Sequence, residues 1–236
     1  MKNKIIFITI VIITFIVLVL GVYQVYKNKD NIESDSLKFR NEYMELNDRI
    51  NEKTGLLFKE VTISSNNTIK YINESKTINL LKNGTGIIFF CNALNIDCRI
   101  SSSIISEIGI DLEETIYYLD STNITPTFEI SNKKLNKVKN GTKNYYKILS
   151  YLEKYLNDFY LTDDEGNIYY ASEKVLEVPT IIAVSNGDIT NLKVISTNSV
   201  DGNLTNEELN ELNRNITSLI KNNKANNEVC DVNKKC

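Results

Sequence analysis

The chain has 236 residues, with 27 basic and 30 acidic side chains and a formal net charge of -3. This length is enough for one domain with a sizeable core, and the charge balance provides no basic field for nucleic acid. The chain has no histidine, which excludes Ser-His-Asp and Cys-His catalysis and histidine-based zinc sites. The four cysteines are poorly spaced for zinc, and no glycine-rich phosphate loop is present. We therefore expect neither a metal nor a cofactor.

The segment Ile5–Tyr23 is an apolar run without charge. As a helix it reaches about 28 Å, close to the hydrocarbon core of a bilayer at about 30 Å. It predicts a single anchor in the cell membrane, after a short basic N-terminus at residues 1–4. Counting basic residues alone favours a cytoplasmic domain. A short basic head and four cysteines in a cysteine-poor chain favour the extracytoplasmic side, which is the orientation we expect.

Residues 24–54 are predicted to form an amphipathic helical stalk. The apolar positions recur at helical spacing, at Ile32, Phe39, Tyr43, Leu46 and Ile50. This stripe could bind a partner helix in a membrane complex. Because fewer than three heptads are present, a stalk or a helix packed on its own domain is favoured.

Residues 55–221 are predicted to form an α/β domain with a central mixed sheet flanked by helices. The continuous apolar run Gly86–Cys91 indicates a strand buried on both faces. A helix through Ile100 to Gly109 connects it to the strand Thr115–Leu119, so a right-handed crossover makes the two strands parallel. The first part of the domain is expected to contain two more strands and a helix, at Phe58–Ser64, Ile69–Ile72 and Asn73–Lys82.

The second half of the domain begins with a polar stretch, residues 120–140, which we interpret as mainly loop. A strong helical periodicity follows over Tyr145–Phe159. A strand after Pro179 is expected to form a hairpin through Asn186-Gly187. A capping box of Thr205 and Glu208 starts the last helix, which ends near Leu219. Residues 222–236 are expected to form a flexible tail that carries a cysteine pair.

The order of these elements resembles the thioredoxin fold. The segment GIIFFCNALNIDCR (Gly86–Arg99) is similar to the redox loop of small membrane-associated thioredoxin-like proteins of low-GC Gram-positive bacteria, including the bacteriocin transport accessory group. The segment from Lys143 to Ile189 is similar to the helix, loop and proline strand of the same family. The resemblance covers residues 61–219. It implies a thioredoxin-like fold and thiol-disulfide exchange on exported proteins or peptides.

Carried over residue by residue, the family's Cys-x-x-Cys motif is incomplete here. Cys98 matches the second cysteine, but Asn95 occupies the position of the first, attacking cysteine, so the motif reads Asn95-Ile96-Asp97-Cys98. An amide cannot replace a thiolate in disulfide exchange, and Asp97 would disfavour a Cys98 thiolate. Pro179 matches the family's cis-proline, so Val178-Pro179-Thr180 is expected to hold a partner's extended chain.

Two other arrangements of the cysteines could restore redox activity. Cys91 lies seven residues before Cys98, and a bridge between them requires Cα atoms within about 7 Å; two separate buried thiols are the favoured alternative. Cys230 and Cys236 are candidates for a local disulfide, with a redox shuttle pair as the alternative. The sequence is thus compatible with an extracytoplasmic oxidoreductase, with a non-catalytic module that binds exported polypeptides, and with a structural domain of a membrane complex.

Overall fold

The computed structural model describes residues 17–19, 33–52, 54–197, 199 and 202–233, with the backbone alone for 225–233. Two compact units are distinguished, Met1–Ser34 and Asp35–Cys236. In the first unit Val17–Val19 are helical, and the rest of the predicted anchor Ile5–Tyr23 lies outside the described residues. Among the residues that are described, no helix has the length and apolar character needed to cross a membrane.

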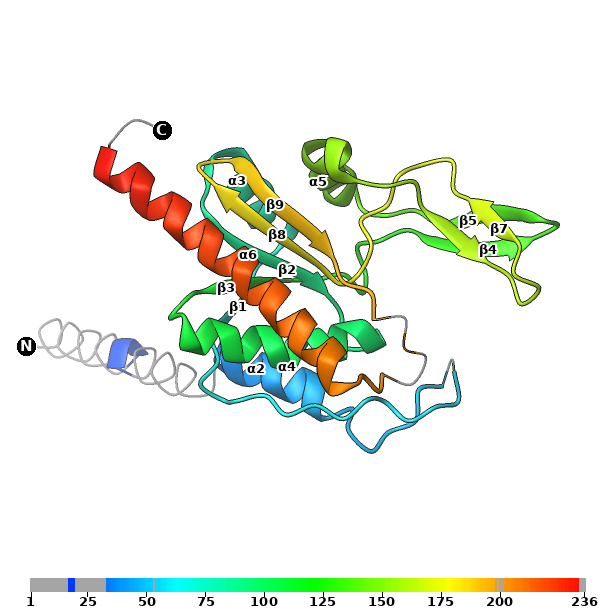
Figure 1. The fold of residues 1–236 in the computed structure, drawn as a ribbon, viewed down its shortest axis with the longest axis horizontal. Helices are drawn as coiled ribbons and strands as arrows, with labels where there is room; N and C mark the ends of the chain where they lie inside the picture. Colours follow the sequence, from blue (N-terminus) through cyan, green and yellow to red (C-terminus); the bar gives the residue numbers. More distant parts are fainter. Residues whose placement is uncertain (1–16, 20–32, 53, 198, 200–201, 234–236) are drawn as a thin grey trace, which may run out of the picture. The chain divides into compact units, whose positions relative to one another are not determined.

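A five-stranded mixed sheet forms the centre of the second unit (Figure 1). Its order is β1 (Ile69–Tyr71), β3 (Ile116–Asp120), β2 (Gly86–Cys91), β8 (Thr180–Ser185) and β9 (Asp188–Val194). The first three strands are parallel, and β8 and β9 are antiparallel to their neighbours. The predicted mixed sheet and the parallel pair are confirmed, and the topology is compatible with the expected thioredoxin-like fold.

Strand β2 is buried along its whole length because helices cover both faces of the sheet. Ile87, Phe89 and Cys91 face the layer formed by α2 (Asp35–Met44), α4 (Ile96–Asp111) and α6 (Asn206–Asn233). Ile88 and Phe90 face the layer formed by α3 (Glu74–Asn83) and α5 (Lys143–Leu152). The strand period of two thus divides one apolar run between two cores.

Several predicted ends and turns are confirmed by their hydrogen bonds. The side chain of Asn73 accepts from the N–H of Lys76 and caps α3. Glu208 accepts from the backbone N–H of Thr205, which completes the capping box of α6. The β8–β9 turn has positive φ at Asn186 (51°) and Gly187 (87°), as a tight hairpin requires. Each of these features depends on residues that are near one another in the chain.

Of the two alternatives favoured for residues 24–54, a stalk or a helix packed on its own domain, the second is confirmed for α2, so the expected domain boundary at residue 55 is wrong. Phe39 and Tyr43 are fully buried against the sheet, and their rings contact that of Tyr118 on β3. The apolar stripe at these two positions is therefore used inside the fold and is not available to a partner helix. Burial of two aromatic rings stabilises the fold by about 1.5 to 3 kcal/mol each, which fixes α2 on the sheet.

The predicted strand Phe58–Ser64 is extended chain that pairs with no strand. Val61 and Ile63 are buried, as the alternating pattern indicates. The backbone of Val61 is instead bonded by the amide of Asn47, which donates to its C=O and accepts from its N–H. A side chain thus replaces the neighbouring strand, which a local sequence pattern cannot show.

Two hairpins occupy segments for which no strands were predicted. Residues 120–140 contain β4 (Thr127–Ser131) and β5 (Lys134–Lys139), and β6 (Tyr160–Thr162) pairs with β7 (Ile168–Tyr170). All four strands are short, with three to six residues each, and β4 and β5 are mostly polar, so the sequence pattern is weak. The turn of the first hairpin, Asn132-Lys133, has both φ values positive, at 52° and 55°. Short polar strands on either side of such a turn indicate a hairpin, and the interpretation of this segment as loop missed this signal.

The helices of the second half also differ in length from those predicted. The predicted helix Tyr145–Phe159 ends at Leu152, followed by the 3-10 turn Glu153–Tyr155. Lys174 donates to the carbonyls of Glu153 and Leu156. A distant side chain thus supplies hydrogen bonds that a longer helix would have made with backbone N–H groups. In contrast, α6 continues through Asn233, so most of the expected flexible tail is helical.

Candidate functional site at the ends of the parallel strands

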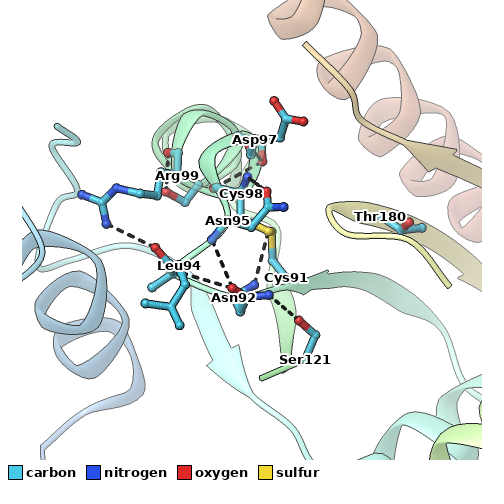
Figure 2. Close-up of a disulfide and its surroundings, with 12 residues drawn as sticks. Cys91, Asn92, Leu94, Asn95, Asp97, Cys98, Arg99, Ser121 and Thr180 are labelled. Carbon is cyan, nitrogen blue, oxygen red and sulfur yellow. Dashed lines mark hydrogen bonds between the residues drawn. A yellow bond between two sulfur atoms is a disulfide. The ribbon is translucent and has the colours of Figure 1, made fainter. Parts of the chain in front are cut away.

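The chain leaves β2 at Cys91 and enters α4 at Ile96, after four connecting residues, at an edge where two parallel strands end. The carboxyl ends of parallel strands are the common ligand-binding edge of open α/β sheets. Asn92 shapes the connection: its side-chain oxygen accepts from the N–H groups of Leu94 and Asn95. Its amide donates to Ser121, which follows β3, at 2.7 Å. The loop is therefore joined to the end of the neighbouring strand (Figure 2).

Asn95 holds the position that the resemblance assigns to the attacking cysteine. It is the N-cap of α4, and its side-chain oxygen accepts from the N–H of Cys98 at 2.9 Å. An amide oxygen at this position stabilises the start of the helix by about 1 kcal/mol. It offers no nucleophile, so this residue positions the helix and performs no exchange chemistry.

Cys91 and Cys98 form a disulfide, with S–S and Cα–Cα distances of 2.01 Å and 5.7 Å. Of the two arrangements that the sequence left open, the structure contains the bridge, and the favoured pair of separate thiols is wrong. Both cysteines are 0% exposed. The N–H of Asn92 points at the sulfur of Cys98, at 3.2 Å. A thiolate from another molecule must reach a sulfur to attack it, so this bridge is sealed from exchange in the folded state.

Asp97 forms hydrogen bonds with a loop that is distant in the sequence. Its carboxylate accepts hydrogen bonds from the hydroxyl and the N–H of Thr197. The expectation that it tunes a Cys98 thiolate is wrong, because Cys98 is bonded to Cys91 and has no thiol to titrate. Asp97 instead connects the segment after β9 to the first turn of α4. Ile96, beside it, lines a hollow described below.

The proline strand lies next to the disulfide through sheet pairing. Phe90 pairs with Thr180, so the cis bond Val178–Pro179 is placed beside the end of β2. Thr180 is fully buried, with its hydroxyl donating to the carbonyl of Glu177. Pro179 is also buried and its carbonyl accepts from Ile195. Val178 is half-buried, and its N–H and C=O form no hydrogen bond with any described residue. Of the three predicted binding residues, Val178 alone offers free backbone groups.

Two hollows lie on either side of Leu94, in the surface beside the helix start. One, of about 540 Å³, is lined by Leu56, Leu57, Phe58 and Ile96 among others. The second, of about 640 Å³, extends over Ile50, Asn92 and Ser121. Phe58, Leu94 and Asn95 line both, so we treat them as one groove.

The groove has unusually exposed apolar walls. Leu94 is 49% exposed and Leu57 66%, and Ile50 and Leu56 are exposed beside them. Clustered exposed aliphatic side chains at a hollow are typical of binding surfaces. One feature of the sequence indicates this apolar surface, the run Leu56-Leu57-Phe58 directly after Gly55. The last residue of this run, Phe58, belongs to the predicted strand Phe58–Ser64.

Arg99 connects the two walls of the groove. Although it lies on α4, its guanidinium donates to the carbonyls of Lys59 and Tyr43, at 2.5 and 2.8 Å, and to Asn47 at 2.7 Å. The side chain is 0% exposed, and no carboxylate is bonded to it within the described chain. Burial lowers the pKa of Arg99 to about 10, so the group stays charged at neutral pH. Sequence reasoning missed this residue because its partners come from three parts of the chain: Tyr43 and Asn47, Lys59, and, through a longer bond of 3.4 Å, Ala93.

The remaining predicted sites are not resolved to side chains. Cys230 lies in the last part of α6, where only the backbone is described, and Cys236 lies outside the described residues. In the part of the chain that the structure describes, no cluster of three or more acidic, cysteine or histidine residues could hold a metal ion.

Comparison with known proteins adds no relative. No family model matches the chain, and the search of curated proteins found no match.

Proposed function

We propose that this chain is a membrane-tethered, thioredoxin-like module that binds extended polypeptide and does not exchange disulfides. The observation that carries the proposal is the combination at one edge of the sheet: Asn95 caps the helix where a nucleophile would be needed, and the only bridge there is fully buried. The sheet order and the cis-proline support the thioredoxin-like assignment.

The absence of exchange follows from access and chemistry together. Exchange begins when a thiolate attacks one sulfur of a disulfide and the other sulfur leaves as a thiolate. Asn95 supplies no sulfur, and Cys91 and Cys98 are bonded to each other without exposure to solvent. The disulfide therefore serves to hold the end of β2 against α4, and thereby fixes the floor of the groove.

Binding of an extended chain is supported by two features that lie near the helix start. Val178 has a donor and an acceptor without partners among the described residues, which a polypeptide strand could bond. The groove beside Leu94 offers apolar hollows for the side chains of such a strand. Backbone bonds would give affinity with little sequence preference, and the hollows would favour large apolar side chains.

The cellular setting follows from the anchor and the bridge. We place the domain on the extracytoplasmic side of the cell membrane, because disulfides persist in oxidising compartments. The anchor Ile5–Tyr23 would keep the domain beside exported polypeptides and beside membrane-complex partners, which raises their local concentration.

The test measures binding of a fluorescent, reduced and alkylated unfolded polypeptide to the purified full-length chain. Leu94→Asp is expected to weaken binding at least about tenfold, because a charge in an apolar hollow is costly. Leu209→Asp is the matched control, since Leu209 is a leucine of similar exposure, 42%, on α6. No binding by the native chain, or equal loss in both variants, would overturn the proposal.

A second candidate, thiol-disulfide oxidoreductase activity, is favoured by the bridge itself, since Cys98 occupies the family's second redox position and is oxidised. This activity would require the helix start to open. Insulin reduction above background that is lost in Cys98→Ala would support the oxidoreductase over the binding module. Insulin reduction at background level only would exclude the oxidoreductase.

A further inference from the structure

The two hairpins form an arm that contributes only Thr127, at the start of β4, to the lining of the groove. The arm comprises β4–β5 and β6–β7, which contact each other although more than twenty residues separate them in the chain. Phe128 and Phe159 pack with ring centroids 5.4 Å apart, and Lys137 bridges Glu173 at 2.8 Å. Figure 1 shows the arm extending away from the five-stranded sheet. We therefore asked what its outer surface could bind.

One face of β6–β7 exposes large apolar side chains. Tyr160 pairs with Tyr170 across the two strands, and their ring centroids lie 5.7 Å apart. These tyrosines are 50% and 63% exposed, and Ile168 on the same face is 52% exposed. The opposite face, with Leu161 and Tyr169, is half-buried. A strand in water normally alternates apolar and polar positions, so a second apolar face indicates a surface that is covered by a partner.

Charges of both signs flank this apolar patch. Lys133, Lys134 and Lys139 are exposed on the β4–β5 hairpin, and none of them forms an ion pair within the described chain. The loop from β6 to β7 exposes Asp164 and Glu165, which likewise have no cationic partner there. One arm thus presents a basic hairpin, an apolar patch and an acidic loop.

From this arrangement we infer that the arm is the contact surface for a second copy of this chain. In a twofold dimer the same patch is used on both subunits. The basic hairpin of one copy would lie against the acidic loop of the other, twice, with the tyrosine pairs between them. An anionic lipid surface would be repelled by Asp164 and Glu165, and a partner of one charge sign would match only half of the arm.

The contact is expected to be weak in dilute solution. Its apolar part consists of only three large side chains, Tyr160, Ile168 and Tyr170, which is typical of small, transient interfaces. Confinement in a membrane raises the effective concentration and would favour the dimer. The inference does not depend on polypeptide binding in the groove, since the charged and aromatic residues proposed for the dimer contact do not line the groove.

The experiment measures self-association of the full-length chain in detergent by sedimentation across a range of concentrations. Two charge-reversal variants are compared, Lys134→Glu with Lys139→Glu, and Asp164→Lys with Glu165→Lys. Each variant alone should self-associate at least about tenfold more weakly, because both contacts become repulsive. A mixture of the two should restore association, because the reversed hairpin then faces the reversed loop in one contact and a native hairpin faces a native loop in the other.

Restoration in the mixture also shows that both variants are folded. Tyr160→Ser with Tyr170→Ser should weaken association as well, while Leu209→Ser, an exposed leucine away from the arm, should not. A native chain that stays monomeric, or dimers that are insensitive to the arm variants, would overturn the inference.

Discussion

Replacement of Arg99 by methionine tests how the walls of the groove are held. The substitution keeps an unbranched apolar stem and removes the guanidinium. The carbonyls of Tyr43, Lys59 and Ala93 then lose a donor, while the side-chain oxygen of Asn47 keeps the N–H of Val61. A buried acceptor left unpaired costs about 1 kcal/mol or more, so we expect Arg99→Met to lower the free energy of unfolding by roughly 3 kcal/mol.

Urea denaturation followed by circular dichroism measures this loss directly. The midpoint should fall without a change in the slope of the transition, which would show that the denatured state is unaltered. Arg99→Lys is the informative companion, because an ammonium group keeps the charge but lacks the planar fork that reaches three segments. We expect it to recover less than half of the loss. A loss below about 1 kcal/mol in Arg99→Met would refute the reasoning, because the acceptors would then have found other donors.

Three further outcomes follow from particular contacts. Cys91→Ala with Cys98→Ala should lower stability by roughly 2 to 3 kcal/mol, the entropy of closing a short loop, and an unchanged urea midpoint would contradict this. Burial raises the pKa of the Glu42 carboxyl, so its contribution to stability is complete below the ordinary carboxyl pKa and is lost as pH rises through the raised value. Glu42→Gln should therefore flatten the decline in thermal midpoint as pH rises above the ordinary carboxyl pKa, and a parallel decline in both proteins would exclude this cause. Gly187→Ala should lower stability by about 3 kcal/mol, because its φ is 87° and a Cβ would lie 2.4 Å from a backbone oxygen of α3. Gly166→Ala, at φ 85° with open space around it, should lose only about 1 kcal/mol in the same thermal scans.

Features that depend on neighbouring residues could be predicted from the sequence. The apolar run of β2, the cap at Asn73 and the turn at Asn186-Gly187 each need only a few adjacent side chains. The resemblance to the thioredoxin family indicated where to look, since Asn95 and Cys98 do lie at the start of a helix that follows a buried strand. These observations located the candidate site before its contacts were known.

Features that join distant segments could not be predicted in this way. The stripe with Phe39 and Tyr43 favoured a stalk or a helix packed on its own domain over a partner helix, and only its packing on β3 assigned it to the domain. The strands of the arm are too short to give a clear pattern in the sequence, and they are stabilised by contacts with each other across the chain.

The sequence by itself thus determined the central strands, the helix caps and the amide of Asn95 at the position where the resemblance expects a cysteine, because these depend on residue type and local spacing. The tertiary structure alone decided that Cys91 and Cys98 are bonded and buried, that Arg99 connects three segments, and that apolar side chains line a groove. The physical reason is that burial, cross-links between segments and cavity shape depend on which segments pack together. The free energy that holds these segments together comes from the whole core and not from local residues.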